Sequence, residues 1–322
     1  MLTKMGIRKI IVSSLALIAL LLLYLMPTSN NTNHTLANDN IEYVYTNDVE
    51  VIYLLDSNDY IARTTIKSCD GSPTEKAKDL TEGLIIGGEK SNIIPSGFRS
   101  LIPTGTEVLN ISLENKILTI NFSKEILDIN KDYEEAMIES IIYTLTSING
   151  IDKVIIQVEG ENLTKLPNTN KILPTILDRN FGINKSYSLT NTNDIESYTI
   201  YYVSSYNNNE YYVPVTKYVN SPKQDKIKVI IDELSTSPIY ETNLMSYLNS
   251  NVNLIDYSLE DKNISLNFND SILNDTTNNK ILEEVIYTIS LSVMDNFNVE
   301  EVSFLVNDEQ IYKNSLKSLE IK

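Results

Sequence analysis

The order of hydrophobic and polar residues divides the chain of 322 residues into three regions. An unbroken apolar run covers residues 10–26, and a polar stretch rich in Asn and Thr follows it up to residue 45. From residue 46 onwards, segments that alternate between apolar and polar residues, typical of strands, are interspersed with segments in which apolar residues recur every three or four positions, typical of helices. The pattern therefore predicts a folded region that is preceded by an apolar helix and a flexible tether.

The apolar run has the features of a membrane anchor. Its 17 residues would form about 25 Å of helix, near the lower limit for crossing a bilayer, and Lys4, Arg8 and Lys9 precede it without any acidic residue. The positive charges place residues 1–9 in the cytoplasm and everything after the span outside. We therefore expect an anchor at 10–26 and a tether at 27–45. The alternative is a cleaved signal peptide, for which Leu36-Ala37 is the only candidate site.

The rest of the chain contains one sequence unit twice. Residues 109–127 recur as residues 255–273 at a constant offset of 146, with identical residues at Ser112, Leu113, Glu114, Lys116, Asn121, Phe122, Ile126 and Leu127 of the first copy. Residues 52–53 match residues 200–201, and residues 142–145 match residues 286–289. We therefore predict two tandem domains of about 115 residues, each long enough to bury its own core. The predicted bounds are 46–160 for the first domain, 161–196 for a connector, 197–312 for the second domain and 313–322 for a tail.

Each copy predicts the same succession of elements. Two strands rich in β-branched and aromatic residues come first, and a capped helix follows. A hairpin, a helix with a continuous apolar stripe and a last strand complete the unit. The capping signals are Ser72, Pro73 and Glu75 in the first copy and Ser221, Pro222 and Gln224 in the second. The predicted fold class is α+β: two tandem small domains, each a mixed β-sheet with two helices on one face.

Charge and composition exclude several classes of function. The chain has 43 acidic and 26 basic residues and a net charge of −17, so it lacks the basic face that a nucleic-acid-binding protein needs. A single His (His34), a single Cys (Cys69) and no Trp argue against a His- or Cys-based zinc site, an iron–sulfur cluster, an internal disulfide and a Ser–His or Cys–His dyad. We therefore predict no catalytic residue, no cofactor and no metal site.

The ordered motifs of the two copies resemble the GerM family, whose repeated domain is called GerMN. In the first copy they are residues 102–106, 118–122, 142–145 and 154–160, and in the second copy they are residues 264–268, 286–289 and 302–306. The second copy departs from the family pattern, because it lacks the Pro-Thr-Gly turn and the Gly that closes the first copy. The chain also lacks the lipidated Cys of many similar proteins, so the apolar run would hold it in the membrane instead.

The resemblance implies a non-enzymatic protein of sporulation or spore germination in endospore-forming bacteria. Its domains would be similar to ring-building motifs, small α/β domains that stack side by side in secretion-type rings. Its partners would be other proteins of the trans-envelope complex that joins mother cell and forespore, and a homo-oligomer is left open. We expect a single-pass membrane protein with a cytoplasmic N-terminus and with its domains in the intermembrane space.

Polar residues that recur in both copies are candidates for contact with a partner protein: Asn121, Asn267, Tyr143, Tyr287, Thr144 and Thr288. Asn is disfavoured in strands, and the alternative for the two asparagines is a hydrogen bond to a neighbouring loop. The alternative for the tyrosines is a half-buried ring with its hydroxyl at the rim of the core. The acidic pairs of the chain are interpreted as solvated surface, and Cys69 as an inert thiol.

The leading hypothesis is therefore an extracytoplasmic scaffold that docks through domain faces or sheet edges. The alternative is a surface ligand-binding or sensor module for a glycan or a germinant-related molecule, which would need a concave pocket with converging polar and aromatic groups. A hydrolase of the cell wall would need a converging acid/base pair, and we do not expect one.

Overall fold

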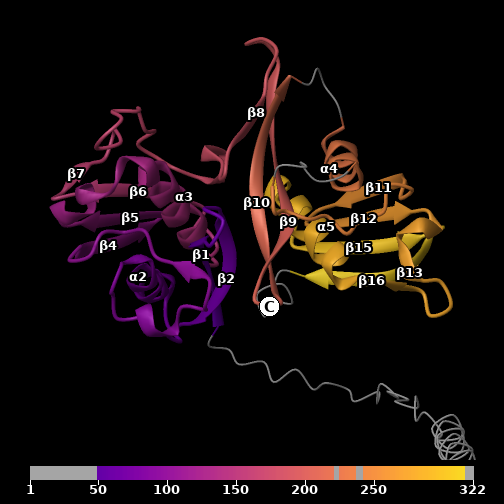
Figure 1. Ribbon diagram of the computed structural model, residues 1–322, viewed down its shortest axis with the longest axis horizontal. Coiled ribbons are helices and arrows are strands. Elements are labelled where there is room, and N and C mark those ends of the chain that lie inside the picture. Colours follow the sequence, from indigo (N-terminus) through magenta and orange to yellow (C-terminus); the bar gives the residue numbers. More distant parts are fainter. Residues whose placement is uncertain (1–48, 221–224, 237–241, 316–322) are drawn as a thin grey trace, which may run out of the picture. The chain divides into compact units, whose positions relative to one another are not determined.

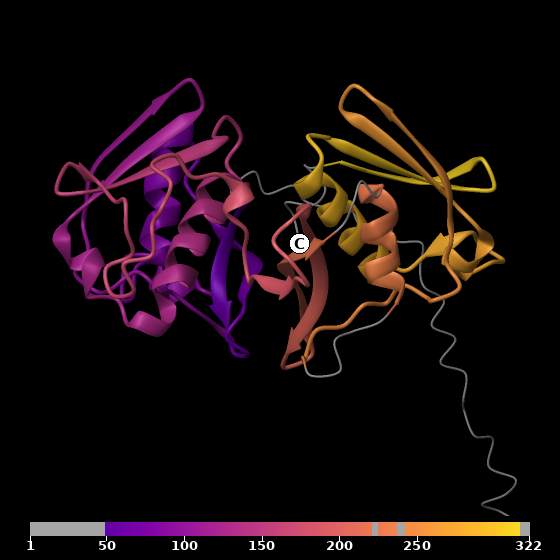
Figure 2. The same ribbon diagram turned by 90° about the horizontal axis from the view of Figure 1, so that it is seen from above.

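The computed structural model describes residues 49–220, 225–236 and 242–315. The described residues form one compact unit. Within it, a six-stranded sheet belongs to both halves, and each half adds a layer of helices and a four-stranded sheet of its own (Figures 1 and 2). The prediction of an α+β tandem is confirmed.

The first half runs from β1 to β7. Its regular elements are β1 (Val49–Asp56), β2 (Ile61–Lys67), α2 (Pro73–Leu84), β3 (Phe98–Arg99), β4 (Val108–Glu114), β5 (Ile117–Phe122), α3 (Glu134–Leu145), β6 (Lys153–Val158) and β7 (Glu161–Asn162). Short 3-10 turns are η1 (Ser91–Ile93), η2 (Lys124–Asp128) and η3 (Lys131–Tyr133). The predicted capping box at α2 is present, because the Ser72 hydroxyl accepts from the Glu75 N–H and the Glu75 carboxylate accepts from the Ser72 N–H.

The second half repeats this order after a linking segment that contains η4 (Arg179–Phe181) and β8 (Ser186–Ser188). Its elements are β9 (Ile195–Tyr206), β10 (Asn209–Asn220), α4 (Lys226–Ser235), β11 (Leu254–Glu260), β12 (Asn263–Phe268), η5 (Asp270–Ile272), β13 (Leu273–Asp275), β14 (Lys280–Ile281), α5 (Glu283–Asn296), β15 (Glu301–Val306) and β16 (Glu309–Ser315). The capping signals predicted at 221–224 lie outside the described residues. The described part of α4 is capped by Asp225, whose side chain accepts from the Ile227 N–H.

The prediction of one mixed sheet per half with both helices on one face is wrong, because the helices lie between two sheets. The first half has one sheet of its own, which contains β4, β5, β6 and β7. In this sheet β5 and β6 run parallel, and α3 connects them along the chain. The strands β1 and β2 belong instead to the shared sheet. Nine consecutive residues from Met137 to Leu145 are buried in α3. A helix that is buried on every side must be covered on more than one face.

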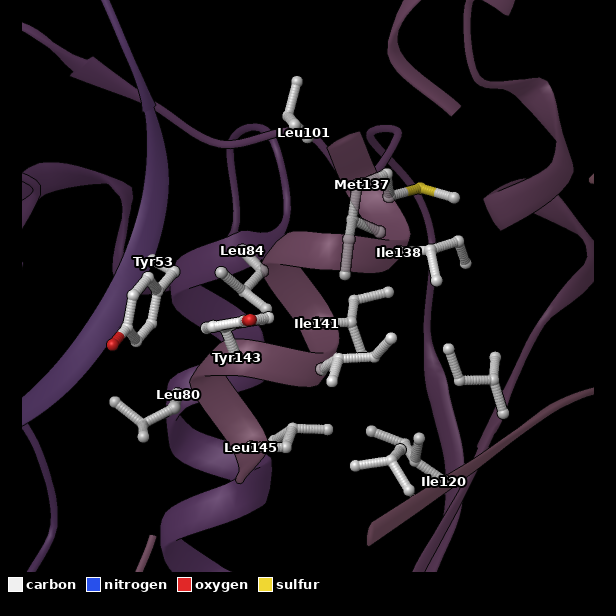
Figure 3. Close-up of a cluster of buried hydrophobic side chains, with 14 of the residues drawn as sticks. Tyr53, Leu80, Leu84, Leu101, Ile120, Met137, Ile138, Ile141, Tyr143 and Leu145 are labelled. Atoms are coloured by element: carbon white, nitrogen blue, oxygen red, sulfur yellow. The ribbon is translucent and has the colours of Figure 1, made fainter. Parts of the chain in front are cut away.

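The second buried face of α3 includes polar residues, so the hydrophobic pattern of the sequence does not reveal it. Ile141 and Leu145 point towards Ile120 of the four-stranded sheet, whereas Tyr143 lies on the side of Tyr53 in β1 (Figure 3). The Ser140 hydroxyl donates to the Tyr53 carbonyl oxygen at 2.6 Å, so this face of the helix is held partly by hydrogen bonds. An apolar stripe alone therefore identifies only one of the two surfaces that α3 packs against.

The predicted membrane anchor at 10–26 and the tether at 27–45 lie outside the described residues. Among the described residues, no helix combines the length and the apolar character that a membrane span requires.

Candidate functional site: the junction between the two halves

The two halves meet where β2 and β10 join the shared sheet. Arg63 of β2 pairs with Tyr212 of β10 in antiparallel register, and the side chain of Asn184 connects the same strands a short distance away. Its amide nitrogen donates to the carbonyl oxygens of Ile61 and Pro214, each at 2.7 Å, and its amide oxygen accepts from the Ile61 N–H at 2.9 Å. One side chain of the linking segment thus continues the sheet from one half into the other.

Equivalent residues of the duplication touch each other at this junction. The hydroxyl oxygens of Tyr53 in β1 and Tyr201 in β9 are 2.9 Å apart, and both rings are buried. The two residues belong to the repeated pairs at 52–53 and 200–201. An approximate twofold axis brings equivalent residues into contact, and the equivalent strands β2 and β10 also pair antiparallel, as such an axis requires. The halves are therefore related as the subunits of a symmetric dimer, although they are one chain.

Arg179 of the linking segment occupies the centre of the junction. Its guanidinium lies 4.9 Å from the Tyr143 ring centroid and 5.7 Å from the Tyr53 ring centroid, and its Nη1 lies 2.6 Å from Oδ1 of Asp295 at the end of α5. Its Nε donates to the Thr146 hydroxyl at 3.1 Å. Arg179 therefore contacts α3 of the first half and α5 of the second with one planar group, as guanidinium does well.

The electrostatics of the junction favour this pairing. Burial alone would lower the pKa of Arg179, but the carboxylate of Asp295 together with the surrounding tyrosines outweighs burial and raises this pKa well above its usual value. Burial, and then the charge of Asp295, raise the pKa of Tyr143 and of Tyr201 well above 10. The tyrosines are thus neutral hydrogen-bonding groups at neutral pH, and the arginine is the cation that balances the buried carboxylate.

Replacing Asn184 by alanine is expected to lower the free energy of unfolding by about 2 kcal/mol, because two carbonyls and one N–H at the strand junction lose their partner. Chemical denaturation of residues 46–322 measures the effect. Asn180→Ala is a matched control from the same segment, since Asn180 makes only an exposed hydrogen bond through its backbone. Equal stability of the Asn184 variant and the control would contradict the role of Asn184 in the sheet.

Stability is expected to fall above pH ~10. The folded-state pKa values of Tyr143 and Tyr201 are raised, and burial raises that of Tyr211 to about 12. Unfolded tyrosine ionises near pH 10, so the unfolded state loses protons first and the free energy of unfolding decreases by about 1.4 kcal/mol per pH unit for each such tyrosine. Below pH 10 both states are protonated and this contribution stays constant. Denaturation curves between pH 8 and pH 11 test this, and a flat profile would contradict it.

Asn121 and Asn267, predicted as candidates for partner contact, have equivalent roles inside their own halves. Asn121 accepts from the Gly160 N–H at 2.9 Å, and Asn267 accepts from the Asp308 N–H at 3.1 Å. Each asparagine holds the two-residue turn after a closing strand, where Glu159, Gly160, Asn307 and Asp308 all have positive φ. The recurrence is thus explained by the loop hydrogen bond that the sequence left as the alternative.

Tyr143 and Thr144 lie in the interior and not on a docking surface. Both are fully buried. The Tyr143 ring packs edge-on against Tyr53 with centroids 5.4 Å apart, and its hydroxyl donates to the Arg179 carbonyl oxygen at 3.2 Å. The Thr144 hydroxyl accepts from the Tyr53 N–H at 2.9 Å. These residues join α3 to β1 and to the junction, so burial removes them from contact with a partner protein.

Tyr287 and Thr288 are not the spatial equivalents of Tyr143 and Thr144. The Tyr201 N–H donates to Ser292 at 2.9 Å, just as the Tyr53 N–H donates to Thr144, and both pairs are related by 148 positions rather than by the 144 of the sequence match. The matched motif is therefore displaced by one helical turn. Tyr287 instead stacks on Tyr212 at 5.5 Å, and the buried Thr288 donates to the Glu284 carbonyl oxygen.

Sequence reasoning missed Arg179, Asn184 and Asp295. The first two lie in the predicted connector, whose many Asn and Thr residues resemble a loop. A usable signal was present, because Arg179 is one of only four arginines in the chain and its neighbours are mostly uncharged. Patterns of acid/base pairs or metal ligands do not identify a residue whose role is to hold two domains together.

Two clefts accompany the junction and the first half. A polar cleft of about 410 Å³ opens beside Arg179 and is lined by Lys153, Lys226 and Asn296 among others. A more apolar cleft of about 680 Å³ lies in the first half, between Ile94, Phe98 and Tyr133. Within the described ranges, no group of three or more His, Cys, Asp or Glu side chains converges as a metal site would require.

Comparison with known proteins agrees with the duplication. A family profile named Germane, described as sporulation and spore germination, matches residues 51–164 and again residues 199–312. The spore germination protein GerM of Bacillus subtilis (strain 168) is 32% identical over 263 residues, which cover 80% of this chain and 70% of that protein. The solved structure of the tandem GerMN domains of the sporulation protein GerM from Bacillus subtilis has a TM-score of 0.74 at 31% identity and covers 81% of this chain and 91% of that one.

Proposed function

The chain belongs to the Germane family of sporulation and spore germination proteins, and we propose that it serves there as a non-enzymatic assembly protein. Its two GerMN domains would act outside the cytoplasm, held at the membrane by residues 10–26. They would dock with other proteins of the trans-envelope complex of sporulating cells. The scaffold role, the partners and the location are proposals that extend the family assignment.

One observation carries this proposal: the most elaborate polar cluster of the described chain is structural. Arg179, Asp295, Tyr53 and Tyr201 satisfy one another across the junction. Arg179 and Asp295 also line the polar cleft beside the junction, but there they are paired with each other. A catalytic centre would instead leave such groups free to meet a substrate. The Arg179–Asp295 pair fixes two similar domains in one arrangement. Such a chain is suited to presenting surfaces at a defined spacing.

Deletion of the gene from its spore-forming host tests the proposal. We expect fewer heat-resistant spores, and mislocalisation of proteins of the mother cell–forespore complex in sporulating cells. Complementation with residues 1–322 should restore both, whereas a form without residues 1–26 should not. Normal spore counts together with normal localisation in the deletion strain would overturn the proposal.

The apolar cleft of the first half supports a second candidate, a ligand-binding or sensor module. Its volume of about 680 Å³ and the aromatic residues Phe98 and Tyr133 suit a small molecule. Titration of residues 46–322 with cell-wall fragments or germinants, followed by NMR, discriminates between the two. Saturable shifts at Phe98 and Tyr133 would favour the sensor, and their absence would favour the assembly protein.

A further inference from the structure

The edge strand β11 exposes an apolar stripe, whereas the equivalent stripe on β4 of the first half is covered. Tyr257 and Leu259 lie opposite Leu266 and Ile264 of β12, which are fully buried beneath the helices. Residues opposite each other share one face of a sheet, so Tyr257 and Leu259 point to the same side as the core. They are nevertheless 39% and 51% exposed.

The duplication shows that this exposure is specific to the second half. Leu113 of β4 is the equivalent of Leu259, and Leu113 and Ile111 are half-buried and pack against the core of the first half. There α2 packs on β4, whereas α4 packs mainly on β9 and α5. The same strand pattern is therefore covered in one copy and open in the other.

The outer edge of β11 is also open to a further strand. β11 is the first strand of the sheet β11-β12-β15-β16, and among the described residues it pairs with β12 alone. Exposed strand edges offer unpaired N–H and C=O groups to an added strand. The apolar stripe and the unpaired backbone thus lie on one element.

The charges of β11 define what the added strand should carry. Asp256 and Glu260 are exposed on the face opposite the apolar stripe, and neither carboxylate makes an ion pair or hydrogen bond within the described part of the chain. In β4 the equivalent positions are Asn110 and Glu114, so β11 has one more carboxylate. Opposite charges across a strand pair stabilise it, and like charges weaken it.

We propose that β11 is a docking edge for an extended segment of another protein whose residues alternate between apolar and basic. The apolar residues would cover Tyr257 and Leu259, and the basic residues would face Asp256 and Glu260. Backbone hydrogen bonds would add the segment as a further strand, a known mode of peptide recognition. This proposal rests on the assembly role above and specifies the chemistry of the partner.

Pairing of β11 with β11 of a second copy fits the charges poorly. In an antiparallel arrangement centred on Ser258, each Asp256 would face Glu260 of the other copy. Two pairs of like charges would then lie directly opposite each other, which destabilises a sheet. The free carboxylates of β11 therefore favour a basic partner over a second copy.

The test uses residues 46–322 and a synthetic peptide of alternating lysine and valine. The expected result is saturable binding by fluorescence anisotropy, with NMR shifts concentrated at the β11 amides. The double variant Asp256→Lys/Glu260→Lys should weaken this binding about tenfold, because two favourable cross-strand pairs become repulsive. The same variant should prefer a peptide of alternating glutamate and valine. Leu259→Ser, at the more exposed position of the stripe, should also weaken binding with little change in melting temperature.

The first half supplies a matched control. Asn110→Lys/Glu114→Lys makes the equivalent change on β4 and should leave binding of the lysine peptide unaltered. A block peptide of the same composition distinguishes strand addition from adsorption to an acidic protein. Equal binding of the block peptide, shifts away from β11, self-association through β11, or an unaffected charge-swap variant would each overturn the docking edge. None of these results depends on spore formation, so the proposed function is judged separately by the deletion strain.

Discussion

Replacing Arg179 by alanine is expected to destabilise residues 46–322 by about 3 kcal/mol, the lower end of the cost of removing one partner from a buried ion pair, because the Arg179 side chain is 28% exposed. The Asp295 side chain is 3% exposed and would remain as a buried carboxylate without its cation. The Thr146 hydroxyl and the rings of Tyr53 and Tyr143 would lose their contacts with the guanidinium as well. Urea denaturation followed by circular dichroism measures the loss.

Two further variants separate charge from geometry in this prediction. Arg179→Lys keeps the charge but not the planar group, so it should retain only part of the stability. Arg179→Met/Asp295→Leu removes both charges and should recover most of what the alanine variant loses. A loss below about 1 kcal/mol for Arg179→Ala, the range of an exposed ion pair, would show that the junction does not depend on this arginine.

Phe122→Ala and Phe268→Ala are each expected to destabilise the protein by about 3–5 kcal/mol. These residues occupy equivalent positions on β5 and β12, and both side chains are completely buried. Phe268 packs against Phe304 with ring centroids 6.2 Å apart, so its truncation leaves a cavity beside another aromatic ring. Differential scanning calorimetry and urea denaturation of the two variants measure the loss.

The number of thermal unfolding transitions in these two variants tests whether the two halves unfold together. Because the halves share a sheet and the Arg179–Asp295 pair, either substitution should lower the temperature of one common transition. Leu113→Ala and Leu259→Ala form a matched pair at equivalent positions, and only the packed Leu113 should cost appreciable stability. Two resolved transitions, of which each variant shifts only one, would contradict the coupling of the halves.

The duplication and the element order could be predicted because they depend on local signals. The apolar alternation in β5 and β12 and the cap at Ser72 correspond to the strands and the helix of the structure. The family assignment followed from the same repeated motifs and is confirmed by the comparisons. Periodicity and capping report on a residue and its near neighbours in the chain, and these features require nothing more.

The junction could not be predicted because it depends on contacts between residues far apart in the sequence. Arg179 and Asp295 are separated by 116 positions, and no periodicity relates them. The one-turn displacement between Thr144 and Ser292 is likewise invisible to an alignment that matches Thr144 with Thr288.

Asn121 and Asn267 recur because each holds the turn after its closing strand. Tyr143 and Tyr287, in contrast, match in sequence but pack against different residues. The docking edge, in contrast, is proposed where the two copies differ.

The proposed role places the function on a surface of the two folded domains, rather than in a catalytic site. Counting heat-resistant spores in a complemented deletion strain tests this proposal most directly. The strain would express the wild-type chain, the Asp256→Lys/Glu260→Lys variant of β11 or the Asn110→Lys/Glu114→Lys variant of β4, at equal levels. We predict that the wild-type chain and the β4 variant restore spore formation and that the β11 variant does not. Normal spore formation in the uncomplemented deletion strain would contradict the role in sporulation, and full restoration by the β11 variant would contradict the docking edge.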